Sequence, residues 1–202
     1  MYEKFGQFID GKWVKSSSGE TYEVINPANE ETIGNASKAS PKDVEAALKS
    51  AEKGLEVWKK TPPWQRAYIL RRIADKMREK QDVLAKWMTL EVGKPFNEAK
   101  GEVNGAADIY EWNAEETKRI YGQTVESRFE DTRVHVYYQP VGVVAALVPW
   151  NFPLVLSARK ISTALAAGCS VIVKPDVITP GVVMEQVEIC RECGVPPGVV
   201  NL

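Results

Sequence analysis

The chain has 202 residues, enough for one large domain or one and a half small ones, and with 44% hydrophobic and 26% charged residues its composition is typical of a soluble globular protein. Its formal net charge of −1 offers no basic field for nucleic acid or an anionic membrane surface. The first residues contain no apolar signal core, no apolar run is long enough to span a bilayer, and three cysteines make no disulfide framework. We therefore expect a cytoplasmic protein with no metal site.

Short strands and turns are predicted over residues 5–39. Asp10-Gly11 lies between apolar residues, which is a strong β-hairpin signal. Asn26-Pro27 is typical of a turn. This first part of the chain is therefore expected to contain small antiparallel ribbons.

Four helices are predicted next. Ser40 and Pro41 are the N-cap and first residue of the first, and the second follows Pro62-Pro63. The third ends near Gly93, and the fourth runs from about Phe96 to Ile120. Apolar residues recur at helical spacing and are expected to form the core, the aromatic residues included: Val44, Ala47, Leu48, Ala51, Leu55, Val83, Tyr110 and Trp112.

Residues 122–140 show a different periodicity. Val134, Val136 and Tyr138 alternate with polar or amphipathic residues, as in a half-buried strand that residues 123–128 could pair with. Such a ribbon needs a surface to pack on, and on these residues alone an ordinary edge hairpin remains an alternative. His135, the single histidine, is expected at the surface.

The organising stretch runs from Val141 to Val173. Two apolar runs, 141–148 and 169–173, predict parallel strands buried on both faces, joined by a helix that begins after Pro153. Asn151 and Lys174 each follow the carboxyl end of a strand, where ligands bind in such sheets.

A further helix and strand complete the pattern. Thr179 is predicted as an N-cap with Pro180 at N1, Gly194 ends the helix, and residues 199–202 begin another strand. The order βαβαβ is one half of a doubly wound sheet, although no G-x-G-x-x-G is present.

Three motifs in this order resemble the aldehyde dehydrogenase superfamily: residues 149–153 (PWNFP), 164–169 (ALAAGC) and 173–175 (VKP). The resemblance runs from about Phe8 to Leu202 and covers the N-terminal part of such an enzyme. It implies an α/β fold: the N-terminal portion of the aldehyde dehydrogenase fold, with an incomplete Rossmann-like parallel sheet, flanking helices and a β-hairpin arm.

The resemblance also implies a division of the chain. Residues 1–121 would supply the N-terminal strands and the helical part of the cofactor-binding domain. Residues 122–140 would form an oligomerisation arm that reaches a neighbouring subunit. Residues 141–202 would form a truncated βαβαβ half of the NAD(P)-binding domain, with one sheet edge uncovered because the chain stops in a central strand. A homo-oligomer is implied for the full-length protein.

Asn151 is the candidate catalytic residue. Its side-chain amide could donate a hydrogen bond to a developing oxyanion, although spacing alone favours a turn or cap asparagine. The resemblance implies that this asparagine holds the oxygen of the thiohemiacetal formed when a cysteine thiolate attacks an aldehyde.

Lys174 is the main candidate for cofactor binding, because a cation at a strand end can bind ribose hydroxyls or phosphate. The resemblance implies a contact with the adenosine ribose of NAD or NADP, and Val148, Pro149 and Trp150 match positions that line the cofactor site. Many NAD-preferring relatives carry a glutamate where Val177 stands, and Asp176 beside it would point differently. We therefore hypothesise that NADP is tolerated or preferred.

Arg159 is the candidate substrate-binding residue. On spacing alone it reads as a solvated surface residue, although arginine binds carboxylates in a bidentate way. Residues 150–160, together with 111–116 and 119–122, resemble succinate-semialdehyde dehydrogenases, in which the matching arginine binds the substrate carboxylate. A small aldehyde with a distal carboxylate is therefore the expected substrate.

The reacting groups of that family lie downstream of these residues. Cys169, Cys190 and Cys193 do not match the nucleophile motif, and Cys190-Arg-Glu-Cys193 falls on the last turns of a helix, where a thiolate is not favoured. The chain alone is expected to be inactive and to need the missing C-terminal part. A non-catalytic truncated paralogue, acting as an interaction or nucleotide-binding module, is the alternative.

Overall fold

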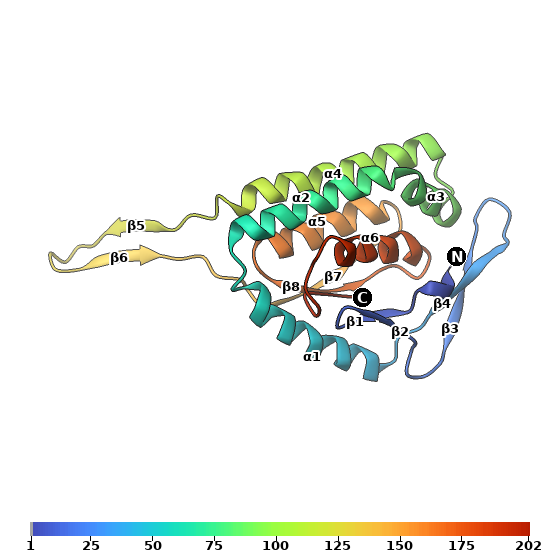
Figure 1. Ribbon diagram of the computed structural model, residues 1–202, viewed down its shortest axis with the longest axis horizontal. Coiled ribbons are helices and arrows are strands. Elements are labelled where there is room, and N and C mark those ends of the chain that lie inside the picture. Colours follow the sequence, from blue (N-terminus) through green and yellow to red (C-terminus); the bar gives the residue numbers. More distant parts are fainter. Residues whose placement is uncertain (1) are drawn as a thin grey trace.

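A short parallel sheet forms the centre of the computed structural model, which describes residues 2–202 (Figure 1). The three strands are joined by two helices and lie in the order β7-β8-β9. Their bounds are β7 Val143–Leu147, α5 Pro153–Ala166, β8 Ser170–Lys174, α6 Pro180–Glu192 and β9 Val200–Asn201. The predicted βαβαβ unit is thus confirmed, with β7 paired to β8 in parallel from Val143↔Ser170 to Leu147↔Lys174.

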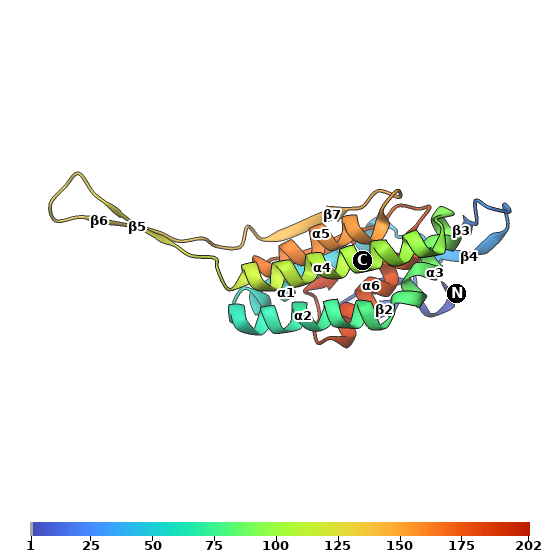
Figure 2. The same cartoon turned by 90° about the horizontal axis from the view of Figure 1, so that it is seen from above.

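Helices cover both faces of this sheet. Helix α1 (Pro41–Trp58) contacts the sheet strands on one face, and α5 and α6 lie on the other (Figure 1). Three further helices pack outside α5 and α6: α2 (Pro63–Glu79), α3 (Gln81–Val92) and α4 (Phe96–Thr117). Seen from above, α4 and α2 run side by side (Figure 2). Helix α4 ends three residues before the predicted Ile120.

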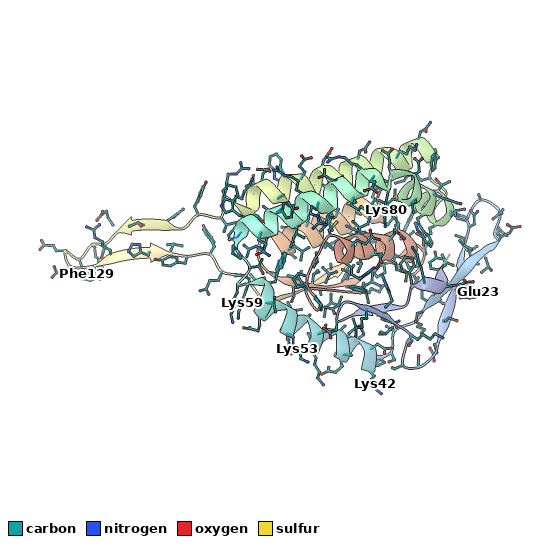
Figure 3. The ribbon with its side chains drawn as sticks, viewed as in Figure 1. Glu23, Lys42, Lys53, Lys59, Lys80 and Phe129 are labelled. Carbon is teal, nitrogen blue, oxygen red and sulfur yellow. The ribbon has the colours of Figure 1, made fainter. Side chains whose placement is uncertain are left out.

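The start of α1 follows the sequence prediction closely. Ser40 and Asp43 form a capping box, and Pro41 is the first helical residue. The buried face consists of small residues and Trp58, whose indole N–H donates to the Leu165 carbonyl oxygen at 2.9 Å. Lys42, Lys53 and Lys59 project from the opposite side of α1 into solvent (Figure 3).

Some apolar residues predicted for the core are exposed instead. Val44, Leu48 and Val83 are exposed, and Trp112 keeps 68% of its surface, whereas Tyr110, two residues earlier in α4, is fully buried. Helical spacing predicts which residues share a face, but the faces of α1 and α4 that meet other elements were decided by packing.

The N-terminal strands form two hairpins, β1 (Gln7–Ile9) with β2 (Lys12–Val14), and β3 (Thr21–Ile25) with β4 (Thr32–Ser37). The Asp10-Gly11 turn has positive φ at both residues, 53° and 77°, as a tight hairpin requires. Phe8 and Leu202 then exchange two backbone hydrogen bonds of 2.8 Å, so β1 lies along β9.

This pairing corrects the expectation that the sheet edge beside the last strand is uncovered. Strand β9 is last in the sheet order and its outer edge is covered by β1, so the open edge belongs to β7. Strand β7 is accordingly not buried on both faces, and Leu147 keeps 64% of its surface. The reason is that β7 has a hydrogen-bonded neighbour in residues 2–202 only on its β8 side.

The arm predicted at 122–140 is a hairpin that extends away from the body in both views (Figures 1 and 2). Strands β5 (Gln123–Glu126) and β6 (Arg133–Val136) pair antiparallel, and Phe129 lies at the tip (Figure 3). Every residue of both strands is exposed, which corrects the expected half-buried strand. His135 is exposed, as expected, with Nδ1 3.2 Å from the Thr124 hydroxyl.

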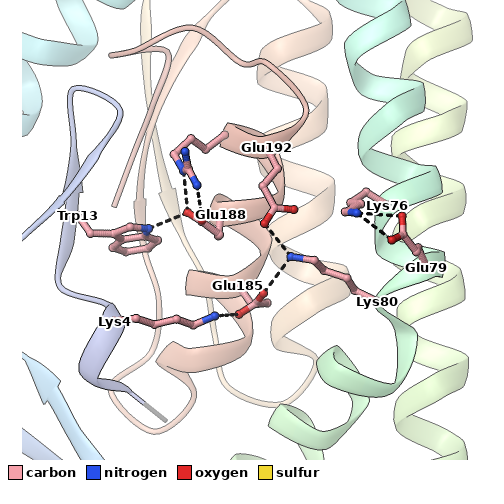
Figure 4. Close-up of polar contacts among 9 residues, drawn as sticks. Lys4, Trp13, Lys76, Glu79, Lys80, Glu185, Glu188 and Glu192 are labelled. Atoms are coloured by element: carbon pink, nitrogen blue, oxygen red, sulfur yellow. Dashed lines mark hydrogen bonds and ion pairs between the residues drawn. The ribbon is translucent and has the colours of Figure 1, made fainter.

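A charge network holds α6 against the N-terminal segment and α3 (Figure 4). The buried Glu185 carboxylate pairs with Lys4 at 2.9 Å and with Lys80 at 3.3 Å, and Lys80 also pairs with Glu192 at 2.9 Å. The Trp13 indole donates to Glu188 at 2.8 Å. Residues from three distant parts of the sequence thus converge on the outer side of α6.

Candidate active site

A cleft of about 490 Å³ lies between α4 and α5. Its α4 side is formed by Glu98, Gly101, Glu102 and Gly105, with Lys94 from the turn before that helix. Its other side is formed by the turn after β7 and the first part of α5: Asn151, Phe152, Val155, Leu156 and Arg159. The structure therefore brings together Asn151 and Arg159, the predicted catalytic and substrate-binding residues.

Asn151 occupies the turn between β7 and α5. Pro149 and Pro153 flank it, and Pro153 is the first helical residue, where its missing N–H leaves no unsatisfied donor. The Asn151 side chain is exposed and makes no hydrogen bond within residues 2–202. Its amide N–H₂ is therefore free to donate to a ligand in the cleft.

The N-terminus of α5 is capped by a residue from another helix. Phe152 at the N-cap position makes no side-chain cap. Instead the Leu154 and Val155 amides donate to one carboxylate oxygen of Glu102 on α4, at 3.0 and 3.2 Å. Lys94 forms an ion pair with the same carboxylate, and only 2% of the Glu102 side chain is exposed.

Arg159 projects from α5 about two turns after its start and is exposed. No carboxylate lies within 4.0 Å of its guanidinium in the part of the chain that the structure describes. An arginine without an ion-pair partner, in the same cleft as the Asn151 amide, can bind a carboxylate in the bidentate geometry that its planar group favours.

The cofactor candidates form a second group, at the carboxyl ends of β7 and β8. Leu147 is in register with Lys174, and the Val148 amide donates to the Lys174 carbonyl oxygen at 3.0 Å. Lys174 is the exposed last residue of β8, and 51% of Trp150 and 54% of Val177 are exposed. The Asn151 turn and Lys174 thus lie at the same rim of the sheet, as predicted.

Two neighbours of Lys174 differ in what they can offer a ligand. The Asp176 carboxylate accepts a hydrogen bond from the Ile178 amide of its own loop at 3.1 Å. Val177 next to it carries no charge and is exposed. Val148 is buried at the base of the rim, and Pro149 is exposed. The rim therefore presents a cation and exposed apolar side chains, and the Asp176 carboxylate beside it accepts a hydrogen bond within its own loop.

Thr179 is the N-cap residue of α6 and Pro180 is at N1, as predicted, but the Thr179 side chain does not cap the helix. Its buried hydroxyl has no hydrogen-bond partner within residues 2–202. Glu91 from α3 takes the capping role: its carboxylate accepts from the Gly181 amide at 2.6 Å, from the Val182 amide at 3.2 Å and from the Tyr2 hydroxyl. Burial raises the pKa of Glu91 to about 7, and burial beside Glu91 raises the pKa of Tyr2.

The cysteines are all buried. Burial raises the pKa of the Cys190 thiol to about 12, and burial also raises the pKa of Cys193. Residues 2–202 contain no group of three potential metal ligands. None of the helices over the same residues is both long and apolar enough to cross a membrane.

Three residues of these sites escaped the sequence analysis. Lys94 was visible only as part of a helix end at Gly93-Lys94-Pro95, and Glu102 and Glu91 read as ordinary polar residues of helices. Their partners lie 52 residues away for Glu102 and 90 for Glu91, so no local pattern could have revealed them.

A comparison with family models decides the relationship. The model of the aldehyde dehydrogenase family matches residues 13–202, nearly the whole chain. The chain belongs to this family. The resemblance of the three motifs is thereby confirmed, and so is the α/β fold that it implied.

Several family members are similar over nearly all of this chain. It is 44% identical over 194 residues to the NADP-dependent succinate-semialdehyde dehydrogenase of Escherichia coli, and 44% identical over 195 residues to the glutarate-semialdehyde dehydrogenase of Pseudomonas aeruginosa. In each case the match covers 96% of this chain and 40% of the relative. The chain thus spans about two fifths of the length of these relatives.

Solved structures match nearly all of this chain and likewise about two fifths of their own length. A crystal structure described as an E. coli NADP-dependent enzyme matches with a TM-score of 0.96 and 43% identity, over all of this chain and 42% of that one. Betaine aldehyde dehydrogenase from Staphylococcus aureus, solved with NAD⁺, matches with a TM-score of 0.96 and 35% identity, over 98% of this chain and 41% of that one.

Proposed function

We propose that this chain is the N-terminal segment of an NAD(P)-dependent aldehyde dehydrogenase that oxidises a small aldehyde with a distal carboxylate, such as succinate or glutarate semialdehyde. The observation that carries the proposal is the cleft in which the Asn151 amide and the unpaired Arg159 guanidinium lie together. The semialdehyde specificities printed for its relatives from E. coli and P. aeruginosa support the same substrate class.

Arg159 and Asn151 have different parts in this function. Arg159 binds the distal carboxylate and so orients the aldehyde end toward the Asn151 turn. The Asn151 amide donates to the aldehyde oxygen as negative charge develops on it, which stabilises the transition state more than the substrate. The cysteine nucleophile and the glutamate base of the family would come from sequence beyond the matched two fifths.

The rim of the sheet would hold the dinucleotide. Lys174 supplies a cation for its ribose or phosphate groups, and Pro149 and Trp150 supply exposed apolar surface, with Val148 buried at the base of the rim. The bound nicotinamide would accept the hydride of the aldehyde. Val177 introduces no carboxylate to repel a 2′-phosphate, and Asp176 is engaged by its own loop, so NADP fits this rim as well as NAD.

Substitution Arg159→Ala in the full-length polypeptide tests the substrate class. We expect KM for succinate semialdehyde to rise about 10- to 100-fold, because a charge-assisted bidentate contact worth about 1.5–3 kcal/mol is lost. KM for butanal, which lacks the carboxylate, should change little. Lys160→Ala removes a cation from the next position of α5 and serves as the control.

Steady-state kinetics with both aldehydes, each measured with NAD and with NADP, gives the answer. An equal loss with both aldehydes would contradict the carboxylate role of Arg159. A strong preference of the unaltered protein for NAD would contradict the proposed tolerance of NADP.

A further inference from the structure

The turn that carries Asn151 is held by a buried ion pair that local sequence patterns did not reveal. Glu102 reaches across from α4 and accepts hydrogen bonds from the Leu154 and Val155 amides, the first two backbone N–H groups of α5. Its side chain is 2% exposed and that of its partner Lys94 is 10% exposed. A carboxylate so far from water is stable only if its charge is compensated, and here both a cation and two helix N-terminal amides compensate it.

Lys94 also touches the turn itself. Its Nζ atom lies 3.5 Å from the Asn151 carbonyl oxygen and 3.9 Å from the centroid of the Phe152 ring. The ion pair therefore contacts the backbone of Asn151 and the residues that follow it, up to Val155. Lys94 contacts the backbone of Asn151 and the ring of Phe152, and Glu102 contacts the amides of the next two residues after Pro153.

We propose that Lys94 and Glu102 are positioning residues that fix the Asn151 amide toward the α4–α5 cleft. The inference rests on the proposed role of Asn151 as the oxyanion donor. Such a donor is effective only when it is held in place before charge develops, and a misplacement of about 1 Å can reduce the rate about 100-fold. Neither residue donates to the substrate; each acts through the backbone of residues 151–155.

The chain offers a matched control for this proposal. Helix α6 begins in the same manner as α5, with proline at N1 and the next two amides bound by a buried glutamate from another helix, Glu91. Glu91→Gln and Glu102→Gln therefore make the same chemical change at equivalent helix starts. Only Glu102 borders the cleft with Asn151.

The test is steady-state kinetics of Glu102→Gln, Lys94→Met and Glu91→Gln in the full-length polypeptide, at saturating NADP. We expect Glu102→Gln and Lys94→Met to lower kcat about 10- to 100-fold with succinate semialdehyde and with butanal alike, with KM changed less than about threefold. Glu91→Gln should keep kcat within about twofold while its thermal midpoint falls.

A double-variant cycle separates positioning from simple loss of stability. In an Asn151→Ala background, where no amide remains to be positioned, Glu102→Gln should lower kcat by less than about twofold further. The positioning role would be overturned if Glu102→Gln lowered kcat equally with and without Asn151. It would also be overturned if Glu102→Gln alone left kcat unchanged. Absence of aldehyde oxidation by the unaltered protein would instead overturn the proposed function, so the two failures are distinguishable.

Discussion

Buried glutamates are the residues on which the site depends most. Helices α5 and α6 both begin with proline and lack a side-chain cap from their own segment. Glu102 and Glu91 bind the free amides instead, each from a helix outside the βαβαβ unit. The two carboxylates differ in what balances their negative charge. Glu102 forms an ion pair with Lys94, whereas Glu91 accepts hydrogen bonds from the Tyr2 hydroxyl and from two backbone amides. A carboxylate without a cation feels the full cost of burial, which accounts for its raised pKa.

Glu91 should make stability fall as pH rises from about 5 to 7. Its folded pKa of about 7 exceeds the ordinary value of 4.5, so in this window the folded state binds more protons than the unfolded state. The free energy of unfolding then decreases with pH, by up to about 1.4 kcal/mol per pH unit for one group. Urea unfolding at pH 5, 6 and 7 measures this slope, and Glu91→Gln should flatten it.

Asp43 does not titrate between pH 5 and 7, so it does not contribute to this slope. Although burial opposes its ionisation, hydrogen bonds from Ser40 and Ser17 hold the pKa of Asp43 well below its ordinary value of 3.8. Its contribution to stability is therefore complete above that value and is lost only in stronger acid. A protein that gains stability between pH 5 and 7, or an unchanged slope in Glu91→Gln, would contradict the assignment to Glu91.

At the scale of elements, α1 shows how a predicted helix can present an unexpected face. Its start was correctly predicted from Ser40 and Pro41, because a cap depends only on neighbouring residues. Its inner face was predicted only in part: Ala47 and Ala51 are buried as expected, but Val44 and Leu48 are exposed while Gly54 is buried. Gly54 lies against the backbone of Gly198, in the loop that leads to β9, so α1 approaches the sheet more closely than larger side chains would allow.

Substitution Gly54→Ala should destabilise the protein by about 1–3 kcal/mol. A Cβ atom there would lie 2.2 Å from the Gly198 carbonyl carbon, and backbone atoms cannot move aside cheaply. This penalty exceeds the gain of about 1 kcal/mol that alanine brings to a helix interior. Thermal unfolding measures the change.

Gly101 of α4 provides the control. A Cβ atom there meets nothing within 4 Å, so Gly101→Ala should stabilise the protein by about 0.5–1 kcal/mol. Equal shifts of the two variants would contradict the close approach at Gly54.

At the scale of the molecule, two surfaces of the described chain are unpartnered: the edge of β7 and the β5–β6 arm. The arm extends from the body with all of its strand residues exposed (Figures 1 and 2). An isolated two-stranded ribbon is marginally stable in water. Its exposed apolar residues, Val125, Phe129, Val134 and Val136, are therefore suited to packing on another surface, and we propose that this is a second copy of the protein.

Replacing residues 123–136 by a short Gly-Ser link in the full-length polypeptide should abolish the homo-oligomer. The folded body should remain, because the arm contributes no buried residue to its core. Sedimentation velocity measures the assembly and circular dichroism the fold. An oligomer of unchanged size would contradict the role of the arm.

The sequence alone determined the order of elements, the turns at Asp10-Gly11 and Pro149–Pro153, and the rim shared by Asn151 and Lys174. These features depend on residues close together in the chain, or on the rule that parallel strands bring their carboxyl ends to one edge. Tertiary structure alone decided that Glu102 and Glu91 cap α5 and α6, that β1 covers β9 and that the arm is exposed on both faces. Each of these depends on which surfaces meet, and periodicity within one segment carries no information about its partner.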